Sequence, residues 1–106
     1  MKSRFFDEDF SISKQFSLRM LNQLKYETSY TSDLEEEAIR IVAIKEDHKV
    51  SLLLKQARKG MVKVTIEVDR PIKKIADYEE RKRLEISLIN SLEAYICASD
   101  EFVLGV

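Results

Sequence analysis

The sequence predicts a small α+β domain, in which a three-stranded antiparallel sheet is covered on one face by two helices. Three observations lead to this fold class. Residues 61–69 alternate between β-branched and polar side chains, which indicates a strand with one buried face. Residues 13–26 and 77–98 carry apolar side chains at helical spacing. Two glycines and one proline in 106 residues leave little turn chemistry for a many-stranded sandwich or barrel.

The length allows one hydrophobic core and not two, so we expect a single domain over residues 1–106. Residues 1–12 form an aromatic and acidic lead-in. One interpretation is a flexible segment that acts as a docking peptide, and the other is a terminus anchored to its own core.

The first helix is expected over residues 13–26, with Ser13 as its N-cap. Its apolar face consists of Phe16, Met20, Leu21 and Leu24. The hydroxyl-rich stretch at 28–33 is the best loop candidate in the chain.

Residues 34–58 support two interpretations, and the fold depends on them. In the favoured one, strands at 38–45 and 49–56 precede the strand at 61–69, because a lone strand would leave its backbone donors and acceptors without partners. The element order is then α-β-β-β-α. The last helix follows Pro71, at about 77–98.

The alternative is a mostly helical, winged-helix-like domain. Ser32-Asp33-Leu34-Glu35 fits a capping box, and Gly60 stands where a helix often ends. In that case Leu53 to Val64 resembles a recognition helix that runs into the wing of a winged-helix domain.

The strand at 38–45 has apolar side chains on both faces and is expected at the edge of the sheet. Such a strand invites pairing with a second chain, which favours a homodimer. Alternatively, the N-terminal phenylalanines fold back to cover it. The predicted interaction surface comprises Phe5, Phe6, Phe10, Ile39 and Ile41.

Catalysis has little support in this sequence. The single histidine, His48, is interpreted as an exposed turn residue, and Cys97 as a mostly buried thiol with no second cysteine beside it. Acidic runs at 7–9, 35–37 and 79–80 are typical of solvated surface. The chain has no phosphate-binding glycine loop or zinc-binding helix motif. We therefore expect no enzyme, with no catalytic residues, cofactor or metal.

Charge is segregated along the chain. Residues 45–83 hold twelve basic and seven acidic side chains, while residues 84–106 hold four acids and no Lys or Arg. A basic middle of this kind recruits anionic partners, and we expect contact with the backbone of DNA or RNA. The predicted nucleic-acid-binding residues are Lys55, Arg58, Lys59, Lys63, Arg70, Lys73 and Lys74.

Base stacking is not expected within this segment, because no aromatic residue lies between Lys45 and Asp77. The competing hypothesis is a protein-interaction module, such as an inhibitor, adaptor or immunity-like protein. It would recognise its partner through the acidic ends and the apolar edge strand. A lone cysteine and short apolar runs indicate a cytoplasmic location and no membrane partner.

The sequence resembles two known families, and one of these resemblances implies contact with phosphates. The α-β-β-β-α order, with Lys73-Lys74-Ile75-Ala76 before the last helix, resembles the double-stranded-RNA-binding domain, whose lysine cluster at this point contacts phosphates. That family's glycine-rich turns and alanine-rich final helix are absent here. Residues 60–66, 72–75 and 84–90, about a third of the chain, are similar to the hairpin and following helix of the YbaB nucleoid-associated family. That family's long N-terminal helix has no counterpart, and its DNA binding is not carried over.

Overall fold

The structure is a computed structural model that describes residues 1–35, 37–46, 48–70 and 75–104, with side chains for all of these except 30, 34, 35 and 98–104. Within these residues, seven elements follow one another. They are β1 (Lys2–Phe6), α1 (Phe10–Gln23), β2 (Glu27–Glu35), β3 (Ala38–Lys45), β4 (His48–Arg58), β5 (Met61–Asp69) and α2 (Ile75–Leu104).

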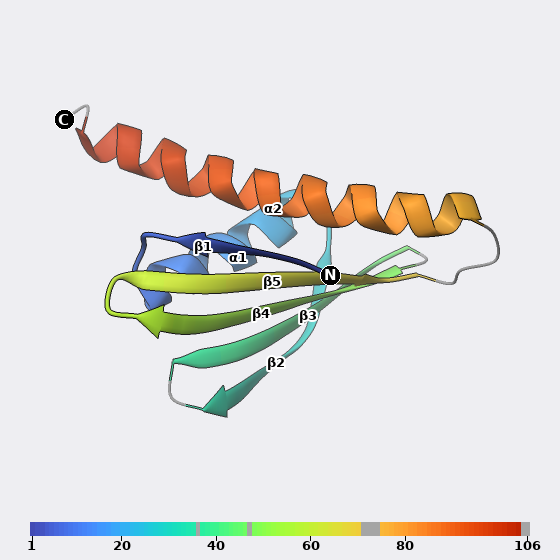
Figure 1. The fold of residues 1–106 in the computed structure, drawn as a ribbon, viewed down its shortest axis with the longest axis horizontal. Coiled ribbons are helices and arrows are strands. Elements are labelled where there is room, and N and C mark those ends of the chain that lie inside the picture. Colours follow the sequence, from blue (N-terminus) through green and yellow to red (C-terminus); the bar gives the residue numbers. More distant parts are fainter. Residues whose placement is uncertain (36, 47, 71–74, 105–106) are drawn as a thin grey trace.

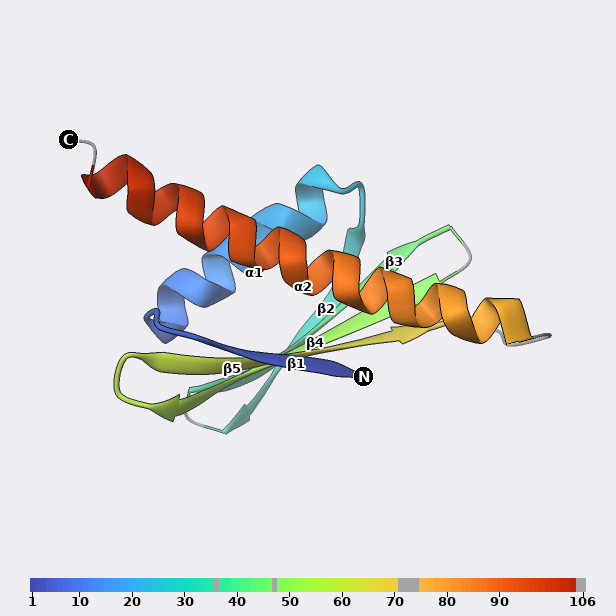
Figure 2. The same ribbon diagram turned by 45° about the horizontal axis from the view of Figure 1, so that its top comes forward.

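The strands form one antiparallel sheet in the order β1-β5-β4-β3-β2. Both helices lie on the same side of this sheet, with α2 running along its length and α1 crossing beside it (Figures 1 and 2). The α+β class predicted from the sequence is therefore confirmed. No helix within the described residues combines the length and apolarity needed to cross a membrane.

The predicted three-stranded meander is present as β3, β4 and β5, but the sheet has five strands, so the predicted number is wrong. The winged-helix alternative is also wrong, because residues 38–45 and 48–58 are strands. The stretch at 28–33, predicted as a loop, lies within β2. β2 is an edge strand that stays largely exposed, so it can be built from polar residues. Its hydroxyl side chains therefore do not show the alternating apolar pattern by which a strand is recognised.

The lead-in at 1–12 contains β1 and the start of α1. β1 pairs with β5 from Lys2–Ile66 to Phe6–Val62, and only Phe6 of this strand is buried. A five-residue strand with one buried side chain carries almost no periodic signal, which is why the sequence pattern did not reveal it.

The prediction that 38–45 is an edge strand is wrong, because β3 lies between β2 and β4. Ile39 and Ile41 point to the helices and are 1% and 0% exposed, while Val42 on the opposite face is 4% exposed. An interior strand explains why neither face of this segment is polar. The argument for a homodimer from an apolar edge strand therefore no longer holds.

The first helix begins three residues earlier than predicted. Asp9 occupies the N-cap position, and its carbonyl accepts a 2.9 Å hydrogen bond from the Ser13 backbone N–H. Ser13 is thus within the first turn of α1 and not its N-cap. Its hydroxyl is buried and is the only buried side-chain oxygen or nitrogen of the described residues that lacks a hydrogen-bond partner.

One hydrophobic core fills the space between the sheet and the helices. Alternate residues of β4 and β5 supply its floor, including Val50, Leu52 and Ile66 at 0% exposure. The helices contribute Met20 and Leu21 from α1 together with Leu88, Ile89, Leu92 and Ile96 from α2. The opposite face of the sheet carries no helix within the described residues (Figures 1 and 2).

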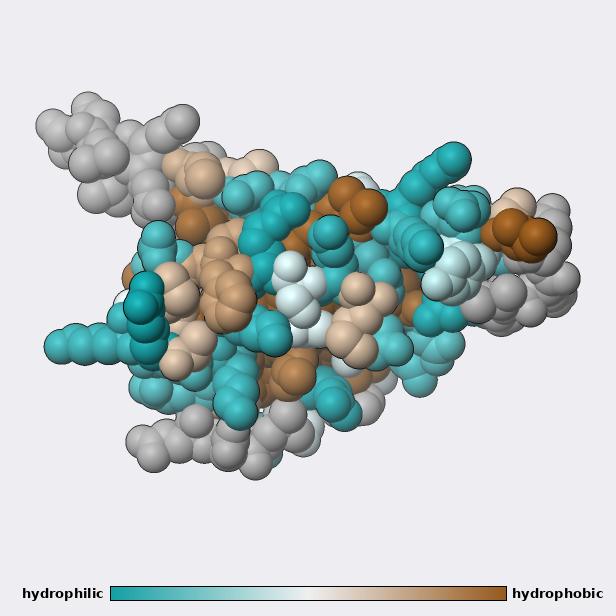
Figure 3. Space-filling view, viewed as in Figure 1, coloured by the Kyte–Doolittle hydropathy of each residue, from teal (hydrophilic) through white to brown (hydrophobic). Residues whose placement is uncertain are grey.

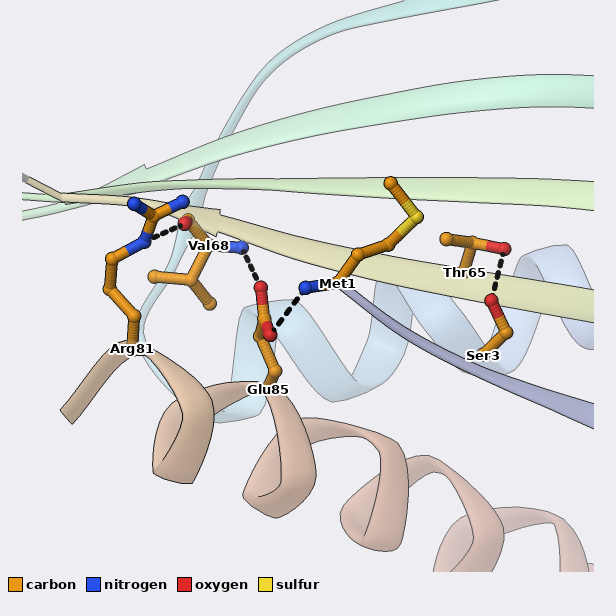
Figure 4. A network of polar contacts seen from close by, with 6 residues as sticks. All are labelled: Met1, Ser3, Thr65, Val68, Arg81 and Glu85. Carbon is orange, nitrogen blue, oxygen red and sulfur yellow. Dashed lines mark hydrogen bonds and ion pairs between the residues drawn. The ribbon is translucent and has the colours of Figure 1, made fainter. Parts of the chain in front are cut away.

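Two side chains of α2 complete the edge of β5 where β1 ends. β1 reaches only to Lys2, which pairs with Ile66, so Val68 has no strand partner on that side. The Glu85 carboxylate accepts the Val68 N–H at 3.0 Å, and the Arg81 Nε–H donates to the Val68 carbonyl at 2.8 Å (Figure 4). The second oxygen of Glu85 pairs with the Met1 ammonium group at 2.8 Å. These side chains act as a neighbouring strand would.

We predict that Glu85→Ala lowers the free energy of unfolding by about 1–3 kcal/mol, because it leaves the buried Val68 N–H without an acceptor. Glu85→Gln keeps an acceptor oxygen and should cost less. Urea denaturation measures both. Glu93→Ala is the control: it removes an exposed 2.8 Å ion pair with Arg4 and should cost less than about 1 kcal/mol. Equal losses for Glu85→Ala and Glu93→Ala would contradict this role of Glu85.

Candidate functional site

Two lysines stand directly opposite each other on the open face of the sheet. Lys55 of β4 pairs in register with Lys63 of β5, and both side chains are exposed. Side chains at directly opposed positions have Cβ atoms about 4.5–5.5 Å apart, and like charges placed there destabilise the pair of strands.

The turn that joins these strands adds two further cations. Arg58 and Lys59 precede Gly60, whose φ of +77° suits glycine in the tight turn that returns the chain to Met61. Lys55, Arg58, Lys59 and Lys63, here called the cationic hairpin, thus gather at one end of the sheet. That end holds the β4–β5 turn in Figure 1.

An aromatic ring lies beside the cationic hairpin. Phe5 pairs in register with Lys63, its side chain is 56% exposed, and the Lys63 Nζ lies 5.8 Å from the centre of its ring. Sequence reasoning found no aromatic residue within the basic segment because Phe5 belongs to β1, which pairs with β5 from the other end of the chain. The alternation of β5 placed Lys63 on the open face, but nothing in the pattern of residues 1–12 showed that part of this segment pairs with β5.

Carboxylates lie near the same end of the sheet. Asp7 follows directly after the Phe6–Val62 pair, and the carbonyl of Glu37 accepts a 3.0 Å hydrogen bond from the Gln56 backbone. These acids reduce the local positive potential. Even so, no ion pair among the described residues involves Arg58, Lys59 or Lys63, so these three charges stay available to a ligand.

Of the other predicted nucleic-acid-binding residues, Arg70 does not join this group. Arg70 follows the far end of β5, about 23 Å from Lys63 at the usual rise per strand residue. Its guanidinium lies 3.5 Å from the Glu80 carboxylate. Lys73 and Lys74 lie outside the described residues.

The predicted interaction surface is divided between core and solvent. Phe6, Ile39 and Ile41 are buried at 5%, 1% and 0% exposure, and Phe10 is half-buried against the core. Phe5 alone of this group is freely exposed. The molecular face in Figure 3 shows hydrophilic side chains with smaller hydrophobic patches among them.

A second charged hollow, of about 230 Å³, lies toward the other end of the open face. Residues of both signs line it: Arg40, Lys49, Glu67, Asp69 and Arg81, together with Val42 and Ser51. Lys49 stands opposite Asp69 in register. Because opposite charges already face each other here, this hollow is a poorer anion site than the cationic hairpin.

His48 begins β4 and is half-buried, with its Nε2 2.8 Å from the Tyr26 hydroxyl. Lys45 holds the same corner, because its ammonium group donates to the Leu24 carbonyl at 2.8 Å and lies over the Tyr26 ring. These contacts tie the β3–β4 turn to the end of α1. His48 is therefore a partner in a structural contact, and the expectation of an exposed turn histidine was too simple.

Burial raises the pKa of Tyr26 above its usual value of 10.0, and the nearby Glu46 carboxylate raises it further. The unfolded chain therefore loses this proton at a lower pH than the folded protein does. Stability falls as the pH rises above about 10, because ionised Tyr26 favours the unfolded state.

We predict that Tyr26→Phe makes this alkaline loss of stability shallower. At neutral pH the same change should cost about 0.5–1.5 kcal/mol, because the hydrogen bond to His48 is lost. Denaturation with urea at neutral pH and above pH 10 measures both effects. Tyr78→Phe is the matched control, since that ring is 48% exposed. An unchanged alkaline slope in Tyr26→Phe would show that Tyr26 does not ionise there.

No group of three or more His, Cys, Asp or Glu side chains within the described part of the chain is placed to hold a metal ion. Cys97 is exposed on α2, and the expectation of a mostly buried thiol is wrong, because its position turns away from the sheet.

The chain matches no known protein-family model, and no curated protein is significantly similar to it in sequence. The site must therefore be judged on its geometry.

Proposed function

We propose that this protein is a small, non-enzymatic regulatory domain that binds the backbone of a nucleic acid through the cationic hairpin. One observation carries the proposal: Lys63 on the open face and Arg58 and Lys59 in the adjoining turn are exposed cations, and no ion pair among the described residues neutralises them. Lys55 stands opposite Lys63 and adds positive charge to the same surface. A phosphate group supplies the counter-charge that these three side chains lack.

The rest of the hairpin supports the same ligand. Arg58 and Lys59 extend the positive charge to the tip of the turn, where a polyanion can approach without meeting the helices. Several phosphates in a row are needed to engage four cations spread over a hairpin, and a nucleic-acid strand supplies them. Long Lys and Arg side chains on such a projection contact phosphates without reading the sequence of bases.

Phe5 favours a single strand over a duplex. Its exposed ring lies beside Lys63, so a strand whose phosphates contact the hairpin can place an unpaired base on the ring. Base–aromatic stacking of this kind contributes about 1–3 kcal/mol per base in proteins that bind single strands. The bases of a duplex are stacked on one another and cannot use Phe5 in this way.

We predict binding to a single-stranded oligonucleotide that weakens steeply with salt. If four phosphates are neutralised, log K should fall with log[salt] at a slope of about −3. The triple variant Arg58→Glu, Lys59→Glu, Lys63→Glu should lose binding at low salt. Fluorescence anisotropy of a labelled oligonucleotide over a salt series measures both results.

The matched control reverses three exposed cations elsewhere on the molecule: Arg19→Glu, Lys25→Glu and Arg83→Glu. It changes the net charge by the same amount and should retain most of the affinity. Equal losses in the two triple variants would mean that only overall charge matters. Affinity that does not change with salt concentration would contradict the proposed phosphate contacts.

We also predict that Phe5→Ala weakens binding to a single strand by about five- to 150-fold, which is the loss of one stacked base. Duplex affinity and the salt slope should hardly change, because all four cations remain. Parallel anisotropy titrations with single-stranded and duplex oligonucleotides test this. An equal loss for both would show that Phe5 acts by supporting the hairpin and not by stacking.

A further inference from the structure

The two edges of the sheet differ in whether other parts of the molecule satisfy their backbone hydrogen-bonding groups. At one edge, β1 is short, and α2 side chains satisfy the backbone of β5 beyond its end. At the other edge, β2 runs for nine residues, and within the described chain no strand pairs with its outer side. An edge strand directs unpaired N–H and C=O groups outward, which is a template for a further strand.

The register of β2 limits where such a strand can add. Irregularities lie between Thr28 and Tyr30 and between Asp33 and Glu35. Between them, the run from Tyr30 to Asp33 pairs regularly with β3. Because β3 is an interior strand that pairs with β4 along its whole length, it holds this run in extended form before any ligand arrives. The bulges confine strand addition to a short segment.

The charge of this edge selects the partner. Residues 27–37 contain five acidic side chains and no Lys or Arg. Glu27, Asp33 and Glu37 are exposed. Lys25 precedes the segment, and Arg40 stands opposite Ser32 on β3, so cations border the strand without lying on it. An extended segment with basic side chains therefore complements β2 in both backbone and charge.

A second copy of this chain is a poorer occupant. Pairing β2 with β2 of another molecule would set two acidic strands side by side, and like charges across a strand pair are unfavourable. The start of β2 also borders an open groove of about 760 Å³, which is lined by Asn22, Gln23, Lys25, Tyr26, Glu27 and Thr28. This groove gives room for one end of an added peptide between α1 and β2.

We propose that β2 accepts a short, extended, basic segment of a partner protein as an additional strand. This surface differs from the cationic hairpin in its charge, so the two take opposite kinds of ligand. A basic peptide is repelled by the hairpin, and a nucleic acid is repelled by β2. The inference therefore stands independently of the proposed nucleic-acid binding.

The test uses a fluorescent peptide of four Lys-Val repeats and the full chain. Anisotropy should show saturable binding at low salt, and hydrogen exchange should show new protection of backbone amides within residues 28–34. The double variant Glu27→Gln, Asp33→Asn should weaken binding about fivefold, as expected for two exposed charge contacts. Its control, Asp7→Asn with Glu79→Gln, removes two exposed carboxylates elsewhere and should bind as the unmodified protein does.

A second peptide separates strand addition from simple charge attraction. It carries the same four lysines, with proline in place of the two central valines, so it cannot form a regular strand. It should bind at least tenfold more weakly. Equal affinity for the two peptides, protection of amides outside β2, or the same loss in both double variants would each overturn the proposal.

Discussion

The pairing of β4 with β5 controls the rest of the structure. It runs from Lys49–Asp69 to Arg58–Met61, and every residue in between is assigned to one face or the other by this register. If β5 shifted by one residue relative to β4, Ile66 would turn outward and Lys63 would enter the core, while Leu52 and Lys55 of β4 kept their faces. The same hydrogen bonds that build the core floor thus also create the opposed lysines on the open face.

The sequence allowed β3, β4, β5 and both helices to be predicted, because each element carries a clear hydrophobic period. Val62 to Val68 alternate strictly, and Leu88, Ile89, Leu92 and Ile96 share one side of α2. β1 and β2 could not be predicted in this way. β1 buries only Phe6, and β2 lies at an edge where polar residues are stable on both faces.

The candidate site was predictable only in part for the same reason. Lys55, Lys63 and the turn residues belong to a local hairpin, so their proximity followed from the pattern. Phe5 reaches Lys63 only through the pairing of the first strand with the fifth, which are separated by nearly the whole of the meander. Arg70 was wrongly grouped with the cationic hairpin because it belongs to the same basic segment of the sequence. In the structure it follows the other end of β5 and lies beside Glu80.

Two surfaces of the molecule differ in the sign of their charge. Positive charge projects at the β4–β5 turn, and negative charge follows β2 at the free edge. A near-neutral chain with a formal net charge of −1 can therefore present two distinct electrostatic surfaces. The separation follows from chain order, since the acidic segment 27–37 and the basic hairpin occupy different strands of one sheet.

The attachment of β1 has a consequence for how the open face behaves over time. This strand is held by five register pairs, one buried ring and the Arg4–Glu93 ion pair, with the Met1–Glu85 ion pair just before it, whereas β4 and β5 are enclosed by neighbours on both sides. Segments with so few buried contacts detach by local opening at a lower free energy than the rest of the domain. The aromatic part of the surface can thus come away from the lysines while the core stays folded, and a bound strand that engages both would hold the N-terminal segment in place.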